Sequence, residues 1–176
     1  MKTVFYILGA MLSTACAQQT VVIQRVPFNP SEYSSLARTG TATVTGQAYI
    51  KTPDGHVHYP HKAQARLNPK TTYSQQWYEI NYLGRQNIAI ADPRYLAYVY
   101  MVDFGANGQF TFRNIPAGDY YLSAPIFWFD ELSQPDGSIL LKRRGAFICY
   151  EVHVEEGNTL VTNITAEQVA DLALLN

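Results

Sequence analysis

The residues best suited to chemistry in this chain are three histidines in the segment GHVHYPH, residues 55–61. In a β-strand, His56 and His58 point to the same side, about 7 Å apart. One metal ion can accept both from a single strand, and His61 can supply a third ligand by bending back past Pro60. The alternative is an exposed hairpin with solvated histidines. We favour the hairpin, because neither a cysteine nor an obvious carboxylate joins the cluster.

A second candidate site is aromatic. The chain has 13 tyrosines, eight phenylalanines and two tryptophans, and many of these rings gather in or beside residues 71–94. Exposed rings stack on sugars or anchor a protein partner. The alternative is that they cover the end of the folded domain. The candidate binding residues are Tyr73, Trp77, Tyr78, Tyr82 and Tyr95.

Other kinds of chemistry find little support in the sequence. It has no Gly-x-Ser-x-Gly nucleophile elbow and no glycine loop ending in Lys-Ser or Lys-Thr. The net charge is −1, and the only basic run, residues 142–144, is better explained as a solvated strand end. We therefore expect no nucleophilic catalysis, no nucleic-acid partner and no cofactor.

The N-terminus is typical of a secretory signal peptide over residues 1–17. A lysine precedes an apolar run of about ten residues, too short to span a bilayer, and small residues follow. Cleavage after Ala17 fits the small-x-small rule. The segment LSTAC, ending at Cys16, instead resembles a bacterial lipobox and predicts a lipid anchor on that cysteine. We favour the lipoprotein, in the periplasm or on the outer membrane, over a secreted form.

The rest of the chain is rich in short strands separated by turns. Residues 108–122, GQFTFRNIPAGDYYL, show two runs of alternating apolar residues joined by a turn with proline and glycine. Many such strands predict an all-β protein, an antiparallel sandwich or barrel. The expected strands are 20–26, 41–50, 56–59, 62–67, 95–102, 108–113, 119–129, 138–141, 146–154 and 159–164. Helices are expected at 30–38, over 71–83 and at 166–176, the last capped by Thr165.

Four segments together resemble a known family. They are TVTGQA at 43–48, ARLNP at 65–69, GQFTFRNIPAGDY at 108–120 and VHVEEGNT at 152–159. Over about residues 41–165 the chain resembles the carboxypeptidase regulatory-like domain, a transthyretin-like (prealbumin) β-sandwich. Exported bacterial members carry an insertion similar to residues 72–94. The resemblance implies a non-catalytic module for folding, adhesion, ligand contact or assembly, because function depends on sites grafted onto the fold.

These observations predict a lead-in at 18–40, a sandwich at 41–165 with an insertion at 71–94, and a C-terminal helix. The expected function is a non-catalytic binding or structural module of the bacterial cell envelope. It would contact other envelope proteins through the insertion, and the membrane through a lipid on Cys16. The alternatives are carbohydrate binding by the aromatics of the insertion, and a metal-dependent enzyme using the histidines of residues 55–61.

Overall fold

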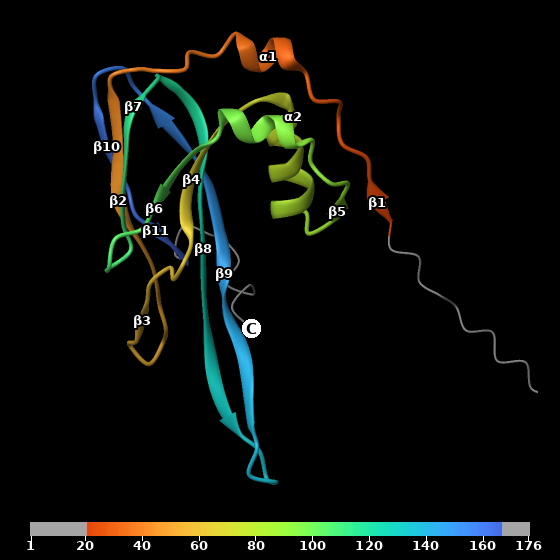
Figure 1. Cartoon of the computed structure of the whole chain (residues 1–176), viewed down its shortest axis with the longest axis vertical. Helices are drawn as coiled ribbons and strands as arrows, with labels where there is room; N and C mark the ends of the chain where they lie inside the picture. The colour runs from red at the N-terminus through yellow and green to blue at the C-terminus, as the bar shows by residue number, and fades with distance from the viewer. Residues whose placement is uncertain (1–20, 167–176) are drawn as a thin grey trace, which may run out of the picture.

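The structure, a computed structural model, describes residues 21–166. Two β-sheets pack face to face, as expected for an all-β sandwich, and short helices lie beside them (Figure 1). The expected signal peptide with Cys16, and residues 167–176 of the expected C-terminal helix, lie outside the described residues. Among residues 21–166, no helix has the length and apolar character needed to cross a membrane.

The first sheet is built around one central strand, β2 (Ala42–Lys51). It is rich in β-branched residues, which fit a pleated, half-buried surface. The sheet is mixed rather than purely antiparallel, because two C-terminal strands run parallel to β2. Its antiparallel partners are β3 (Val57–His58) and β7 (Gln109–Ile115), and its parallel partners are β10 (Thr159–Val161) and β11 (Ile164–Thr165).

The second sheet is antiparallel throughout and carries the candidate site. Its order is β6-β4-β8-β9. The two central strands, β4 and β8, are in register so that Asn68 lies opposite Tyr121 and Arg66 lies opposite Ser123. The strands are β4 (Gln64–Pro69), β6 (Tyr100–Asp103), β8 (Gly118–Ser133) and β9 (Ile139–Val154).

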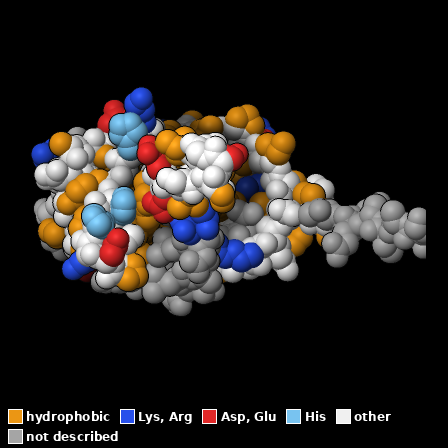
Figure 2. Space-filling view, turned by 90° about the horizontal axis from the view of Figure 1, so that it is seen from below, with side chains coloured by type: hydrophobic (Ala, Val, Ile, Leu, Met, Phe, Trp, Pro, Cys, Tyr) orange, Lys and Arg blue, Asp and Glu red, His pale blue; other side chains and the backbone are white. Residues whose placement is uncertain are grey.

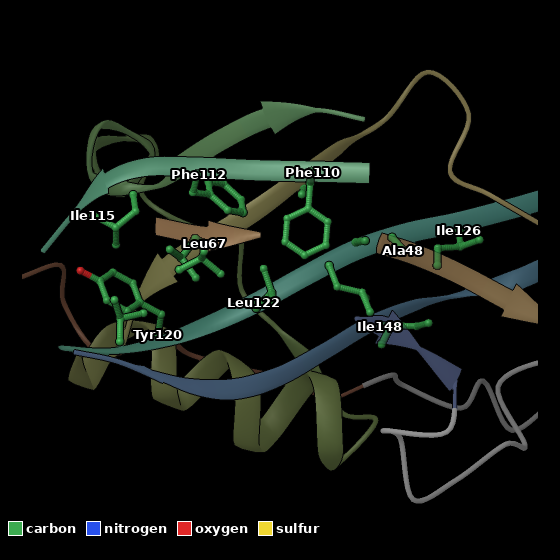
Figure 3. Packing of buried hydrophobic residues seen from close by; sticks show 14 of the residues in the cluster. Ala48, Leu67, Phe110, Phe112, Ile115, Tyr120, Leu122, Ile126 and Ile148 are labelled. Carbon is green, nitrogen blue, oxygen red and sulfur yellow. The ribbon is translucent and has the colours of Figure 1, made fainter. Parts of the chain in front are cut away.

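The core lies between the two sheets. Alternate side chains of β2, β4, β8 and β9 point inward, which is the period expected of a strand with one buried face, whereas β7 shifts its register between Phe112 and Ile115. Figure 3 shows Phe110, Phe112 and Ile115 of β7 facing Leu67 and Leu122 of the second sheet. All five are at most 2% exposed. The alternation in residues 108–122 therefore predicted the centre of the core correctly.

The hairpin of β8 and β9 is longer than expected. The sequence predicted a break between residues 138–141 and 146–154, but β9 is continuous and pairs with β8 from Val154 to Ile139. Near the break predicted, Gly145 has a φ of 101°, and a Cβ there would lie 2.0 Å from the backbone oxygen of Ile126. The end of the hairpin extends beyond the sandwich (Figure 1). It exposes Phe129, Leu132, Ile139, Leu140 and Leu141.

The helices follow the predicted start signals more closely than the predicted ends. Asn29 caps α1 (Pro30–Ser34), which ends before the expected Arg38. Thr71 and Ser74 form a capping box at the start of α2 (Thr72–Gln76). This helix continues as the π-helix η1 (Trp77–Leu83), so the expected helix over 71–83 is confirmed.

The segment after η1 corrects one prediction. Residues 95–98, expected to begin a strand, form the 3-10 helix η2 (Pro93–Tyr98) instead. Pro93 fixes φ in its first turn, and the Asp92 side chain accepts a hydrogen bond from the Arg94 N–H. These local signals outweighed the β propensity of the tyrosines that follow. Two very short strands, β1 (Val22–Ile23) and β5 (Asn87–Ile88), pair in parallel and join the lead-in to the insertion.

Candidate ligand-binding site

The three candidate histidine ligands do not share one environment. The Nδ1 atom of the exposed His56 lies 2.8 Å from Oδ2 of Asp54. The ring of His58 stacks on Trp128 with 3.8 Å between centroids, and burial lowers the pKa of His58. On the face that Figure 2 shows, histidine side chains lie in separate places. Within residues 21–166, no three His, Cys, Asp or Glu side chains converge as ligands for a metal ion, so His61 completes no such set.

The candidate aromatic residues are turned toward the sheet. Tyr82 is 6% exposed, and its hydroxyl accepts a hydrogen bond from the N–H of Cys149 on the edge strand β9. Tyr78 stacks on Tyr121 of β8 with 4.5 Å between ring centroids. Figure 3 shows the helical insertion on the side of β8 and β9 opposite the core. Much of the aromatic surface of the insertion is therefore used to pack α2 and η1 on the outer face of the second sheet.

A cavity of about 90 Å³ remains between the insertion and this face. Its floor comes from three strands, with Asn68 on β4, Tyr121 on β8 and Phe147 on β9. These positions alternate with the core residues, so the strand period that buries Leu122 also turns Tyr121 outward. By the same measure a water needs about 10–15 Å³, so the cavity has room for several waters or one small polar group.

The walls of the cavity are largely aromatic. Tyr73 is 3% exposed, and its hydroxyl accepts a hydrogen bond from the N–H of Asp92 at 2.6 Å, which joins α2 to the start of η2. Trp77 and Tyr95 are only half-buried and also border the cavity. Three of the five candidate aromatic residues therefore meet here, while Tyr78 and Tyr82 pack beside it.

Two residues of the floor each carry a buried polar atom with no hydrogen-bond partner among residues 21–166. These atoms are the hydroxyl of Tyr121, whose side chain is 1% exposed, and Oδ1 of Asn68. Buried polar groups are almost always hydrogen-bonded, because an unpaired one costs about 1–3 kcal/mol. Burial, helped by the negative charges of Glu151 and Glu79, raises the pKa of Tyr121 above its usual range. The hydroxyl therefore stays protonated and can donate as well as accept.

The charged side chains that border the cavity are both basic. Nε of Arg25 donates to the backbone oxygen of Ala89 at 2.7 Å, and its guanidinium lies 5.2 Å from the ring centroid of Tyr73. The side chain of Arg66, on β4, forms no hydrogen bond or ion pair with another residue of 21–166. Within the described part of the chain, no aspartate or glutamate borders the cavity.

The sequence pointed to the insertion but missed the floor beneath it. One sequence signal could have indicated the floor residues Asn68, Tyr121 and Ser123, because they alternate with the predicted core positions of their strands. Arg25 and Phe147 had none, because their proximity to the insertion depends on strand order. The complete border consists of Arg25, Arg66, Asn68, Tyr73, Ser74, Trp77, Tyr95, Leu96, Val99, Tyr121, Ser123 and Phe147.

Comparison with known proteins supports the fold. No model of a known protein family matches the chain, and no curated protein matches it. A similar solved structure is that of a Pseudomonas aeruginosa protein described as a "putative carbohydrate binding protein". The two share 23% sequence identity with a TM-score of 0.63, and the match covers 80% of this chain and 99% of the other. At this identity the likeness shows a shared fold.

Proposed function

We propose that this protein is a non-catalytic binding module that holds a sugar-like ligand in the cavity between the insertion and the second sheet. The observation that carries the proposal is the pair of buried, unpartnered polar atoms at the floor, on Tyr121 and Asn68. A ligand with hydroxyl groups can satisfy both, donating to the amide oxygen and exchanging a hydrogen bond with the phenol.

The walls suit the same class of ligand. A sugar ring presents hydroxyls at its edge and C–H groups on its faces, and aromatic rings such as those of Trp77 and Tyr95 pack on such faces. A few placed polar groups in an otherwise apolar pocket are typical of small-molecule sites. The description of the Pseudomonas aeruginosa protein agrees with this choice. The cavity's size fits one edge of a single ring, with the rest of the ligand at the mouth.

The residues bordering the cavity favour binding over catalysis. Two serines, Ser74 and Ser123, border it, but no histidine or carboxylate of residues 21–166 does, so this part of the chain places no general base beside either serine at the cavity. The hydroxyl of Ser74 already donates to the backbone oxygen of Pro69 at 2.8 Å. A nucleophile without an adjacent base is weak at neutral pH.

We also propose that the module acts in the bacterial cell envelope, with Cys16 as its lipid anchor and other envelope proteins as partners. Labelling of growing cells with radioactive palmitate tests the anchor. The label is expected on the wild-type chain and not on the Cys16→Ser variant. Equal labelling of the two, or none on either, contradicts the anchor.

Titration of the purified protein with a panel of monosaccharides, followed by NMR chemical shifts, tests the binding function. Shifts are expected for residues bordering the cavity, and Tyr121→Phe should weaken the affinity about tenfold by removing one hydrogen bond. Tyr120→Phe is the matched control, because the Tyr120 hydroxyl points away from the cavity and donates to the backbone oxygen of Pro116. Shifts confined to residues outside the cavity contradict the proposal.

A further inference from the structure

We propose that the ligand of this cavity is an acidic sugar, whose carboxylate is bound by Arg66 and Arg25; this rests on the function proposed above. The inference comes from the imbalance of charge around the cavity. Two arginines border it, whereas no aspartate or glutamate of residues 21–166 does. A neutral sugar would supply neither guanidinium with an anionic partner, and a carboxylate is the anion that the planar guanidinium fork fits best.

Arg66 is the better placed of the two to bind the ligand. It stands on β4 opposite Ser123 and two residues from Asn68, so it extends from the same floor as the unpartnered amide oxygen. Within residues 21–166 no acidic group forms an ion pair with it, whereas three acids pair with other lysines or arginines. Asp92 binds Arg94, Asp130 binds Arg144 and Glu151 binds Lys70.

Arg25 has a fixed position at another part of the border. Its Nε donates to the backbone oxygen of Ala89 and its guanidinium lies over Tyr73, while its terminal nitrogens make no hydrogen bond to another residue of 21–166. The negative charges of Glu79 and Glu151 raise the pKa of Tyr121, but these two residues do not border the cavity. Glu151 is also neutralised by Lys70. The charge that meets a ligand in the cavity is therefore positive.

The remaining groups distinguish an acidic sugar from a simple carboxylate. The Tyr121 hydroxyl and Asn68 Oδ1 lie at the floor and require hydrogen-bonding partners of their own. A hexuronic acid carries both parts, a carboxylate for the arginines and ring hydroxyls for the floor. Acetate carries only the first, and glucose only the second.

Calorimetric titration of the purified protein with glucuronate, galacturonate, glucose, galactose and acetate tests the inference. One of the two uronates is expected to bind at least about tenfold more tightly than the matching neutral sugar, since hydrogen bonds to charged groups are the stronger ones. Arg66→Gln should reduce this preference at least about fivefold by lowering the affinity for the uronate, because the guanidinium fork that binds the carboxylate is lost. Arg113→Gln, an exposed arginine on the opposite sheet, is the matched control and should change neither.

The outcomes separate the two proposals. Equal affinity for uronates and neutral sugars, or a preference unchanged in Arg66→Gln, overturns the acidic ligand and leaves sugar binding intact. Acetate binding as tightly as the uronates overturns the sugar component of the ligand. Absence of binding by all five compounds overturns both proposals. We use Arg66 rather than Arg25 because Arg25 also ties the lead-in to the insertion.

Discussion

Replacement of Tyr121 by phenylalanine is expected to make the protein more stable. The hydroxyl of Tyr121 is buried without a partner among residues 21–166, and such a group costs about 1–3 kcal/mol. The ring is unchanged, so its stacking on Tyr78 at 4.5 Å is retained. We expect a gain at the lower end of this range, about 1 kcal/mol, or a Tm higher by about 2–4 °C.

The neighbouring residue supplies a control of opposite sign. Tyr120 is 4% exposed, and its hydroxyl donates to the backbone oxygen of Pro116 at 2.9 Å. Tyr120→Phe removes this bond and leaves a buried carbonyl unpaired, which should lower the free energy of unfolding by about 1 kcal/mol. The same chemical change at two adjacent positions is therefore expected to shift stability in opposite directions.

Urea unfolding followed by tryptophan fluorescence measures both variants. The slope m should be unchanged while the midpoint rises for Tyr121→Phe and falls for Tyr120→Phe. A Tyr121→Phe variant that is less stable than the wild type refutes the reasoning, because it would mean that the hydroxyl is already well paired. A more stable variant with weaker ligand binding identifies the hydroxyl as a group that is kept for binding at the expense of stability.

Three further results are expected. Gly46→Ala should lose about 3 kcal/mol in urea unfolding, because a Cβ there would lie 1.7 Å from the backbone oxygen of Thr162. Arg94 lowers the pKa of Asp92 from 3.8 to about 2, so the ionised carboxylate stabilises the fold above pH 4 and this contribution is lost as the pH falls toward 2. Asp92→Asn should therefore lose less stability than the wild type between those pH values. Cys149 is 2% exposed and burial raises its pKa, so its alkylation by iodoacetamide should follow global unfolding.

Each of these has its own control. Gly55→Ala should cost only about 1 kcal/mol, since its φ of 90° disfavours a side chain but no atom lies within 4 Å of the added carbon. Arg94→Gln should flatten the acid dependence as Asp92→Asn does, and a wild-type slope in either variant contradicts the assignment. Alkylation is measured on Cys16→Ser, which removes the other thiol, and rapid reaction of the native protein would show that Cys149 is accessible.

The sandwich was largely predictable because its strands carry their own pattern. Phe110 and Phe112 alternate with polar residues, and Pro116 and Gly118 mark the turn that follows. The length of β9 was not predictable in this way. Its run of Lys142 to Gly145 is typical of a loop, and it is held in a strand only by pairing with β8. Strand ends of this kind depend on a partner that is distant in sequence.

The sequence predicted the part of the candidate site that the insertion forms, but not the floor on the second sheet. The spacing of Tyr73 and Trp77 indicated a helix in the right place, but not which rings it would bury. The floor depends on register, since Asn68 meets Tyr121 only because β4 and β8 pair as they do. The parallel pairing of β10 and β11 with β2 was missed for the same reason. Pairing is a tertiary property, and residue spacing along one strand does not specify it.

The projecting end of the β8–β9 hairpin should be the first place where a protease cuts the folded protein. A ribbon of two strands alone is marginally stable in water, so this end opens locally far more often than the sandwich unfolds. It carries Lys142, Arg143 and Arg144, which are trypsin sites. Brief digestion should therefore nick the chain there and leave two fragments that stay together, because Gly118 to Ile126 still pairs with Ala146 to Val154.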